Sequence, residues 1–205
     1  MEEFYNYFER HGFLDDEAKD LVLKLIKVIK IKKGDLLISQ NQSFVDKTYF
    51  VLKGCLRSFY VDQSSKEHTL QFSIKGWWIS DYIAFYGGQE AVMSIQALTD
   101  SVVIETTKQN IELVFEKYPH IESIHRKYLE TKLVVLNKRV LNQLNLSARD
   151  RYLKFLDEFP QIQNYAQNYH IASYLGITQQ SLSRIRSEKK FFYHIYDNGY
   201  VEKKC

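Results

Sequence analysis

The sequence predicts an α+β protein with a β-barrel or jelly roll in its first half and helices in its second half. Short segments rich in β-branched and aromatic residues recur between residues 28 and 106. Turn signals such as Lys33-Gly34-Asp35 and Gly87-Gly88 separate these segments. After Thr107 the apolar residues recur at helical spacing instead. Many short strands followed by a run of helices indicate a barrel joined to a helical part.

The composition is that of a folded protein and sets limits on its chemistry. The chain has 205 residues, of which 45% are hydrophobic and 15% aromatic, which is enough apolar surface for real cores. The charged amino terminus and the short apolar runs predict neither a secretory signal nor a membrane span, and hence a cytoplasmic protein without a membrane partner. Two distant cysteines, Cys55 and Cys205, predict no disulfide framework, metal site or iron–sulfur cofactor.

The first predicted domain covers residues 1–118. We expect a helix from Glu2 to Arg10 and a second helix that opens near Asp15, where acidic side chains favour a helix amino end. Five strands are expected in this domain, at residues 28–32, 49–52, 56–61, 69–74 and 101–106. A further helix should pass through Ile111 and Val114.

A long helix is predicted over residues 119–146. Its main apolar stripe has spacings of four, three, four and four residues and consists of Leu129, Leu133, Leu136, Val140 and Leu144. Such a helix needs partners on more than one side. We therefore expect it to pack on its own barrel and on the same helix of a second subunit, and an ordinary buried core helix is the alternative.

The third predicted domain, residues 147–205, is helical. A capping box at Ser147 to Asp150 opens a helix that Pro160 ends. Residues 168–186 then read as two short helices joined at Gly176, which can adopt the positive φ of a tight turn. The face that should fix the angle between these helices consists of Ile171, Leu175, Ile177, Leu182 and Ile185. The tail from Phe191 to Val201 is a candidate wing hairpin.

The second helix of this pair, residues 178–187, presents the chemistry of a base-reading helix. Thr178 is placed to cap it, and Gln179, Gln180, Ser183 and Arg184 point outward. Gln can bond the N6/N7 edge of adenine and Arg the O6/N7 edge of guanine, whereas Arg186, Lys189 and Lys190 suit phosphate. A helical hairpin that merely packs is the alternative reading.

The charge distribution supports a polyanionic partner for the second half. Residues 1–119 contain 14 Lys and Arg against 17 Asp and Glu, whereas residues 120–205 contain 14 against 8. The second half is therefore the natural candidate for meeting double-stranded DNA.

The segment Tyr-His-Ile-Ala-Ser-Tyr-Leu-Gly-Ile-Thr at 169–178, followed by Ser-Leu-Ser-Arg-Ile-Arg at 181–186, resembles the helix-turn-helix of Crp/Fnr (cyclic-AMP receptor-like) transcription regulators. Turns at Lys33-Gly34-Asp35 and Gly88-Gln89-Glu90 resemble that family's sensor barrel. The resemblance implies a cyclic-nucleotide-binding-like sensor, a dimerisation helix and a winged helix-turn-helix. It also implies a homodimer on a palindromic operator, RNA polymerase as a further partner, and base contacts at Gln179, Gln180 and Arg184.

The sensor departs from the cyclic-nucleotide form of that family. Ala91 stands where the phosphate-binding Arg is expected, Asp81 falls at the ribose-binding Glu, and Leu136 falls at a hydroxyl residue that meets adenine. A buried cyclic phosphate without its cation loses its strongest hydrogen bonds. We therefore expect an effector other than cyclic AMP, or none. The residues that would line its pocket are Asp81, Tyr82, Ala91, Val92 and Leu136.

Two other kinds of protein fit parts of the sequence. A cupin-like metalloenzyme also uses a β-barrel and places His, His and Glu ligands on neighbouring strands. Here His68 is the only histidine in the strand region, and Glu67 beside it is expected on the opposite face. No catalytic Ser-His-Asp or Cys-His set stands out, so we predict no enzyme. An interaction protein of the same fold that has lost DNA binding is the second alternative, and the outward Gln179, Gln180 and Arg184 argue against it.

Overall fold

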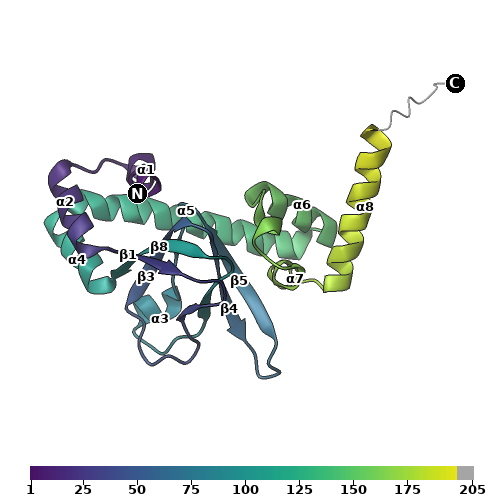
Figure 1. Ribbon diagram of the computed structural model, residues 1–205, viewed down its shortest axis with the longest axis horizontal. Coiled ribbons are helices and arrows are strands. Elements are labelled where there is room, and N and C mark those ends of the chain that lie inside the picture. The colour runs from purple at the N-terminus through teal and green to yellow at the C-terminus, as the bar shows by residue number, and fades with distance from the viewer. Residues whose placement is uncertain (198–205) are drawn as a thin grey trace. The chain divides into compact units, whose positions relative to one another are not determined.

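The computed structural model describes the backbone of residues 1–197 and the side chains of residues 1–188. The chain divides into two compact units, Met1–Leu141 and Asn142–Cys205. The boundary between them falls inside the long helix α5 (Pro119–Asn145), which the sequence analysis treats as a segment of its own. The first unit contains the strands, and the described part of the second unit is helical (Figure 1).

Two antiparallel four-stranded sheets form the centre of the first unit. Sheet A has the order β1 (Lys27–Ile31), β8 (Ser101–Thr107), β3 (Lys47–Lys53) and β6 (Trp78–Ile79). Sheet B has the order β2 (Leu36–Ile38), β7 (Ser94–Ala97), β4 (Cys55–Val61) and β5 (Glu67–Ile74). The α+β fold class is confirmed, although the predicted barrel consists of two sheets rather than one closed cylinder.

The roll core lies between the two sheets. Sheet A contributes Tyr49, Val51 and Val103 to it, and sheet B contributes Leu56 and Ile95, all at most 2% exposed. These residues alternate along their strands with side chains that face away from the roll, as period-two strands require. The inside of the roll is therefore filled by the protein's own side chains.

The five predicted strands are confirmed to within two residues at each end. Three strands were not predicted, namely β2, β6 and β7, which have three, two and four residues. A segment of that length is too short to show an alternation of apolar and polar residues. Their place in the sheets comes from pairing with β7, β3 and β4 respectively.

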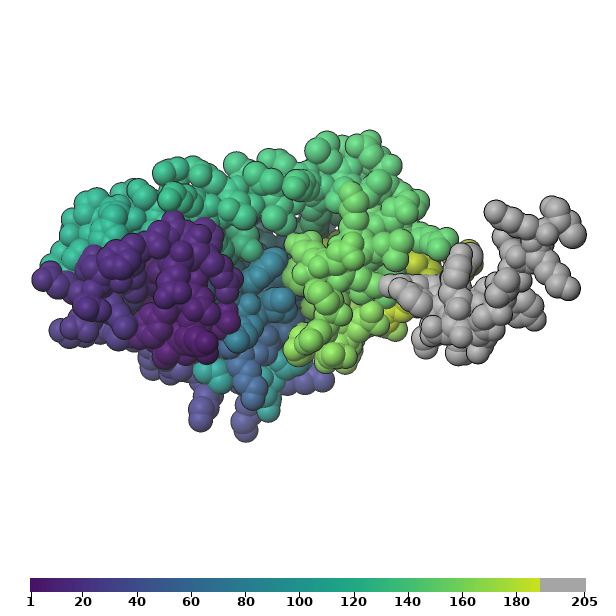
Figure 2. Space-filling view, turned by 90° about the horizontal axis from the view of Figure 1, so that it is seen from above, coloured from purple at the N-terminus to yellow at the C-terminus, as the bar shows by residue number. Residues whose placement is uncertain are grey.

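Helices cover the outer face of sheet A. They are α1 (Glu2–His11), α2 (Asp16–Leu25), α4 (Lys108–Lys117) and the first half of α5, and α3 (Tyr82–Gly87) lies in the β6–β7 connection. Asp15 caps α2, because its carboxylate accepts from Ala18 N at 2.8 Å. In Figure 2 the N-terminal helices, in purple, lie against the first half of α5, in teal. Phe4 and Tyr7 of α1 pack with Phe50 and Trp78 in this second core, which we call the helix-layer core.

The second unit consists of α6 (Ala148–Glu158), a single 3-10 turn at Ile162–Asn164, α7 (Asn168–Leu175) and α8 (Gln179–Asp197). The capping box is confirmed, since Ser147 Oγ accepts from Asp150 N at 3.2 Å. The wing hairpin expected from Phe191 is not formed as far as Asp197, because α8 continues through these residues, which contain no turn signal. The rest of the predicted wing lies outside the described residues.

Within residues 1–197, none of the helices is both long enough and apolar enough to cross a bilayer.

Candidate nucleic-acid interface

The turn between α7 and α8 has the geometry that the sequence predicts. Gly176 ends α7 in the left-handed region, with φ 66° and ψ 37°. Ile177 N donates to Ala172 O at 3.0 Å, and Gly176 N donates to Ser173 O at 3.1 Å, which is the hydrogen-bond pattern of a Schellman cap. A residue with a Cβ is strained at this φ, so Gly176 fixes where the chain reverses.

The inward face of the helix pair is largely confirmed. Ile171, Leu175, Leu182 and Ile185 are between 0 and 9% exposed, and Ile177 is partly buried. Ala172 is 1% exposed, as expected for a small residue where the two helices approach each other. Tyr152 and Phe155 of α6 are also buried, so α6 contributes to the core of the unit that holds α7 and α8.

The outward face of α8 begins at its first turn. Thr178 caps the helix, because its hydroxyl accepts from Ser181 N at 3.1 Å. Gln179, Gln180, Ser183 and Arg184 are all exposed. Since α8 starts at Gln179, two side-chain amides lie in its first turn and one guanidinium lies in the second.

Arg186 does not share this exposed position. Its Nε donates to Tyr152 Oη at 2.9 Å and its Nη1 donates to Asn168 Oδ1, so the guanidinium joins α8 to α6 and α7. Its Nη2 is buried. The sequence predicts a phosphate contact here, but the structure places most of the guanidinium inside the unit. Lys189 and Lys190 belong to α8, but their side chains lie outside the described residues.

The predicted effector-pocket residues all lie in the first unit and differ widely in burial. Asp81 is fully buried, and its carboxylate accepts four backbone N–H groups. Oδ2 accepts from Val92 N at 2.6 Å and Met93 N at 2.9 Å, and Oδ1 accepts from the first turn of α3 at 3.2 and 3.3 Å. A carboxylate with this many protein donors has little capacity left for a ligand hydroxyl.

The other predicted pocket residues differ in how far their side chains are buried. Ala91 is 2% exposed in the roll core, and Tyr82 packs against the same core. Val92 is partly buried, whereas Leu136 is 53% exposed on α5. The structure therefore joins Asp81 to Val92 by a hydrogen bond, places Ala91 in a backbone pair with Asn41 and Gln42, and leaves Leu136 exposed on α5.

The residue on which the metalloenzyme alternative depends has another partner. His68 Nε2 lies 2.7 Å from Asp62 Oδ2 across the β4–β5 turn. Among the described residues, no three His, Cys, Asp or Glu side chains gather where they could hold a metal ion.

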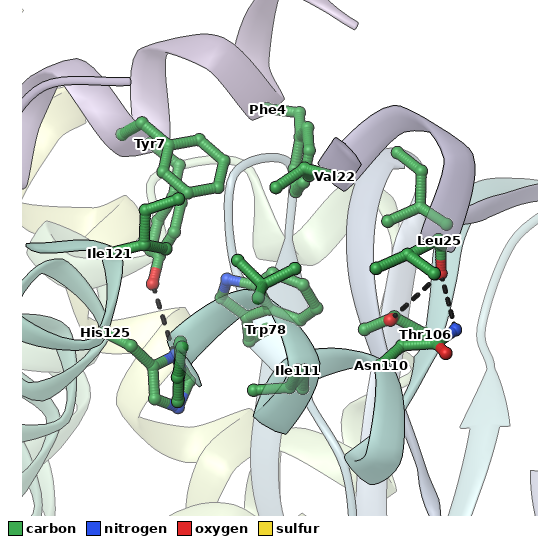
Figure 3. A pocket seen from close by; sticks show the side chains of 14 residues that line it. Phe4, Tyr7, Val22, Leu25, Trp78, Thr106, Asn110, Ile111, Ile121 and His125 are labelled. Atoms are coloured by element: carbon green, nitrogen blue, oxygen red, sulfur yellow. Dashed lines mark hydrogen bonds between the residues drawn. The ribbon is translucent and has the colours of Figure 1, made fainter. Parts of the chain in front are cut away.

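Sequence reasoning missed a polar group in the helix-layer core. His125 of α5 lies between two tyrosines, with Tyr7 Oη at 3.4 Å from Nδ1 and Tyr86 Oη at 3.2 Å from Nε2. Burial lowers the pKa of His125 to about 4, so the imidazole is neutral at pH 7. Figure 3 shows the hydrogen bond between Tyr7 and His125. The one sequence signal was a histidine one turn after Ile121 and next to Ile124, which is too weak to identify a site.

The fold defines a protein of two units, a β-roll with its helices followed by a helical unit in which α7 and α8 form a helix-turn-helix. Residues 28–118 match the family model of the cyclic nucleotide-binding domain. No curated protein sequence matches the chain significantly. The fold assignment for the whole chain therefore comes from solved structures.

Three solved structures illustrate the likeness in fold. The c-di-GMP-responsive global regulator CLP of Xanthomonas campestris has a TM-score of 0.67 at 12% identity, covering 93% of this chain and 96% of CLP. A CooA mutant of Carboxydothermus hydrogenoformans has 0.66 at 21% identity, covering 83% and 79%. The catabolite activator protein of Thermus thermophilus has 0.54 at 18% identity, covering 97% and 90%. At these identities the likeness establishes the shared fold.

Proposed function

We propose that this chain is a homodimeric, sequence-specific DNA-binding transcription regulator of the Crp/Fnr type. The observation that carries the proposal is the exposed edge of Gln179, Gln180 and Arg184, held at the start of α8 by the Gly176 turn. Amide and guanidinium groups at a helix start are suited to base edges in the major groove. Thr178 and Ser183 flank this edge and suit phosphate or base contacts.

The second half of α5 supports a dimer, because its own chain leaves most of its apolar residues exposed. On the side toward the sensor, Lys132 Nζ lies over the Trp77 ring at 3.1 Å from the centroid, and Arg139 donates to Leu70 O. Its apolar side chains Leu133, Leu136, Val140, Leu141 and Leu144 are nevertheless left 47 to 75% exposed. A continuous apolar face of this kind marks an interface, and the same helix of a second copy is its natural complement.

The proposed regulator has three segments. They are a sensor over residues 1–118, the dimerisation helix over 119–146 and the DNA-binding domain over 147–205. Two copies of α8 would read a palindromic operator, with RNA polymerase as a further partner in the cytoplasm, as the Crp/Fnr resemblance implies. In this scheme Arg186 is a positioning residue, because it ties α8 to Tyr152 and Asn168.

The proposed effector is not cyclic AMP. Ala91 supplies no cation for a phosphate and is buried in the roll core, while Asp81 is already bonded by four backbone N–H groups. A buried phosphate needs charge-assisted hydrogen bonds to offset its desolvation. Any effector must therefore use a different chemistry or a different place.

Selection of bound DNA from a random library, followed by mapping of genomic sites, tests the proposal. We expect a palindromic motif. Arg184→Ala should lower affinity for that motif by about tenfold to a hundredfold, the 1–3 kcal/mol of a bidentate base contact, while affinity for unrelated DNA changes little.

Lys154→Ala is the matched control, since it removes a cation that bonds Asn142 within the same unit and lies outside α8. It should keep the preference for the selected motif. Equal binding of the motif by Arg184→Ala and the wild type would contradict the assignment of the reading edge. A wild type without any salt-dependent DNA binding would favour the interaction-protein alternative.

A further inference from the structure

Helix α6 contacts both the end of α5 and the helix α8 through two adjacent residues, Arg151 and Tyr152. Arg151 bonds to the residue that follows α5, and Tyr152 bonds to Arg186 of α8. All of these residues belong to the second unit, Asn142–Cys205 (Figure 1). Within this unit α6 therefore connects the helix that carries the proposed dimer face to the helix that carries the proposed reading edge.

The connection between α5 and α6 consists of two residues, Leu146 and Ser147. Arg151 Nη1 donates to Leu146 O at 2.9 Å. Carbonyl groups at the carboxyl end of a helix have no helical N–H partner, so the guanidinium supplies one here. Arg151 Nε is buried, and Ser147 caps α6. A short connection with a directional hydrogen bond leaves α6 little freedom to turn relative to the last turn of α5.

Arg186 joins α8 to two other helices at once. Nε donates to Tyr152 Oη at 2.9 Å, and Nη1 donates to Asn168 Oδ1 of α7. The guanidinium carbon lies 5.5 Å from the centroid of the Tyr152 ring, Nη2 is buried, and Tyr152 is 1% exposed. A planar guanidinium with donors committed to two helices has few allowed orientations. A turn of α8 about its own axis would therefore lengthen or break at least one of these hydrogen bonds.

The apolar core of the unit holds these helices together but fixes their rotation less strictly. Ile171 of α7 and Leu182 of α8 are both 0% exposed. Hydrophobic attraction is non-directional and depends on the area that is buried. A hydrogen bond, by contrast, weakens steeply when the angle at the donor hydrogen falls below about 120°. The two arginines therefore supply the orientation, and the apolar side chains supply the contact area.

We propose that Arg151 and Arg186 are positioning residues that fix the orientation of α8 relative to the end of α5. The linkage runs from Leu146 through Arg151 and along α6 to Tyr152, Arg186 and Asn168. It stands on contacts within the second unit alone. Its consequence for DNA rests on the proposed function. In a dimer joined along α5, two fixed copies of α8 fit only one spacing between the halves of a palindrome.

Operator spacing is a readout that a merely structural role would not change. One extra base pair between the halves moves them apart by about 3.4 Å and rotates them by about 35°. The wild type should bind this lengthened operator about tenfold more weakly than the selected one, or more weakly still. Arg151→Ala and Arg186→Ala should each reduce this penalty to about threefold, and should bind the selected operator about fivefold more weakly, because a loose linkage has to be ordered on binding.

Tyr152→Phe is the milder test of the same linkage. It removes the acceptor of Arg186 Nε and keeps the ring in the core, so the spacing penalty should fall between those of the wild type and Arg186→Ala. Circular dichroism and thermal unfolding show whether each variant folds. Tyr152→Phe tests the proposal even where Arg186→Ala does not fold.

Two controls separate the linkage from other changes in the unit. Lys154→Ala removes a second contact between α6 and the last turn of α5, to Asn142 Oδ1 at 3.3 Å, but that contact is exposed and contributes little. Ile162→Val leaves a small hole at a residue 1% exposed in the 3-10 turn, which lowers stability without removing any group of the linkage. Both variants should keep the wild-type spacing penalty.

A second measurement needs no DNA. Spin labels at Gln143→Cys in α5 and Ser187→Cys in α8, both exposed positions, report the distance between the two helices in the full chain. Cys205→Ser leaves only Cys55 of the two native cysteines, and Cys55 is 0% exposed. Pulsed electron paramagnetic resonance on labelled protein diluted with unlabelled protein then measures the distance within one protomer.

Arg151→Ala and Arg186→Ala should widen this distance distribution beyond those of the wild type and Lys154→Ala. If both arginine variants keep the wild-type distribution and the wild-type spacing penalty, the proposal fails, whatever happens to their stability. Widened distributions in a protein that binds no palindromic DNA would remove the proposed regulator and leave the linkage. Widened distributions with an unchanged spacing penalty would overturn the consequence for DNA.

Discussion

The two halves of α5 differ in what covers their apolar residues. In the first half Ile121, Ile124 and Tyr128 are at most 6% exposed, and Tyr128 Oη accepts from Trp78 N at 3.1 Å. In the second half Leu133, Leu136 and Leu144 are 53 to 75% exposed. Leu, Ile and Val are more numerous in the exposed half, with seven in residues 132–145 against three in residues 119–131. An apolar stripe therefore shows that a helix face needs cover, but only the contacts show whether the chain itself supplies that cover.

The largest expected effect comes from a charge in the exposed half. Leu136→Glu should weaken the proposed dimer by about a thousandfold, because a twofold interface contains each substituted residue twice and each loses about 2 kcal/mol. Analytical ultracentrifugation over a range of concentrations measures this change. Thr131→Glu, which adds the same charge on another side of α5, is the control and should leave the dimer intact. A dimer unaffected by Leu136→Glu would place the interface elsewhere.

The second prediction compares the halves directly. Ile124→Ala should lower the free energy of unfolding by about 3 kcal/mol, since Ile124 is 2% exposed in the helix-layer core. Leu144→Ala, at a residue 75% exposed, should lower it by under about 0.5 kcal/mol when the protein is dilute enough to be monomeric. Urea unfolding at low concentration measures both. A similar loss of unfolding free energy in the two variants would mean that the chain itself covers both halves of α5 to the same extent.

The third prediction concerns the buried histidine of the first half. Burial lowers the pKa of His125 to about 4 in the folded protein, against about 6.5 when unfolded. Between these values the unfolded chain binds a proton that the folded chain does not, so stability falls as the pH drops from about 6.5 toward 4. At pH 5 His125 should cost about 2 kcal/mol relative to pH 8.

His125→Gln should remove this part of the pH dependence. The measurement is urea unfolding at pH 8, 7 and 5 for both proteins. Between pH 8 and 7 the two should change in parallel, because His125 is neutral in both states there. An unchanged difference between wild type and variant from pH 8 to pH 5 would show that His125 titrates in the folded protein as it does in the unfolded chain.

Much of the fold could be predicted because its signals are local. The Gly176 turn, the Ser147 cap and the longer strands each depend on a few adjacent residues, and all are present in the structure. The strands β2, β6 and β7 depend on pairing partners distant in sequence, which no local pattern reveals.

The candidate site was predictable only in part for a related reason. Outward residues of α8 follow from helical spacing, so the exposure of Gln179, Gln180 and Arg184 was expected. Arg186 has the same residue type as Arg184, and its different environment depends on Tyr152 and Asn168, 34 and 18 residues away. The contact of His125 with Tyr7 and Tyr86 likewise joins side chains from α5, α1 and α3, which sequence spacing cannot indicate.

The carboxylate of Asp81 also determines how the first unit holds the segment between α3 and β7. Backbone N–H groups that converge in this way commonly bind a free anion from solution. Here the acceptor is a side chain of the protein itself. Asp81 therefore bonds the segment that links α3 to β7 to the first turn of α3 without any ion from solution. Removing small ions from the solution therefore leaves these hydrogen bonds in place. A substitution at position 81 would remove them.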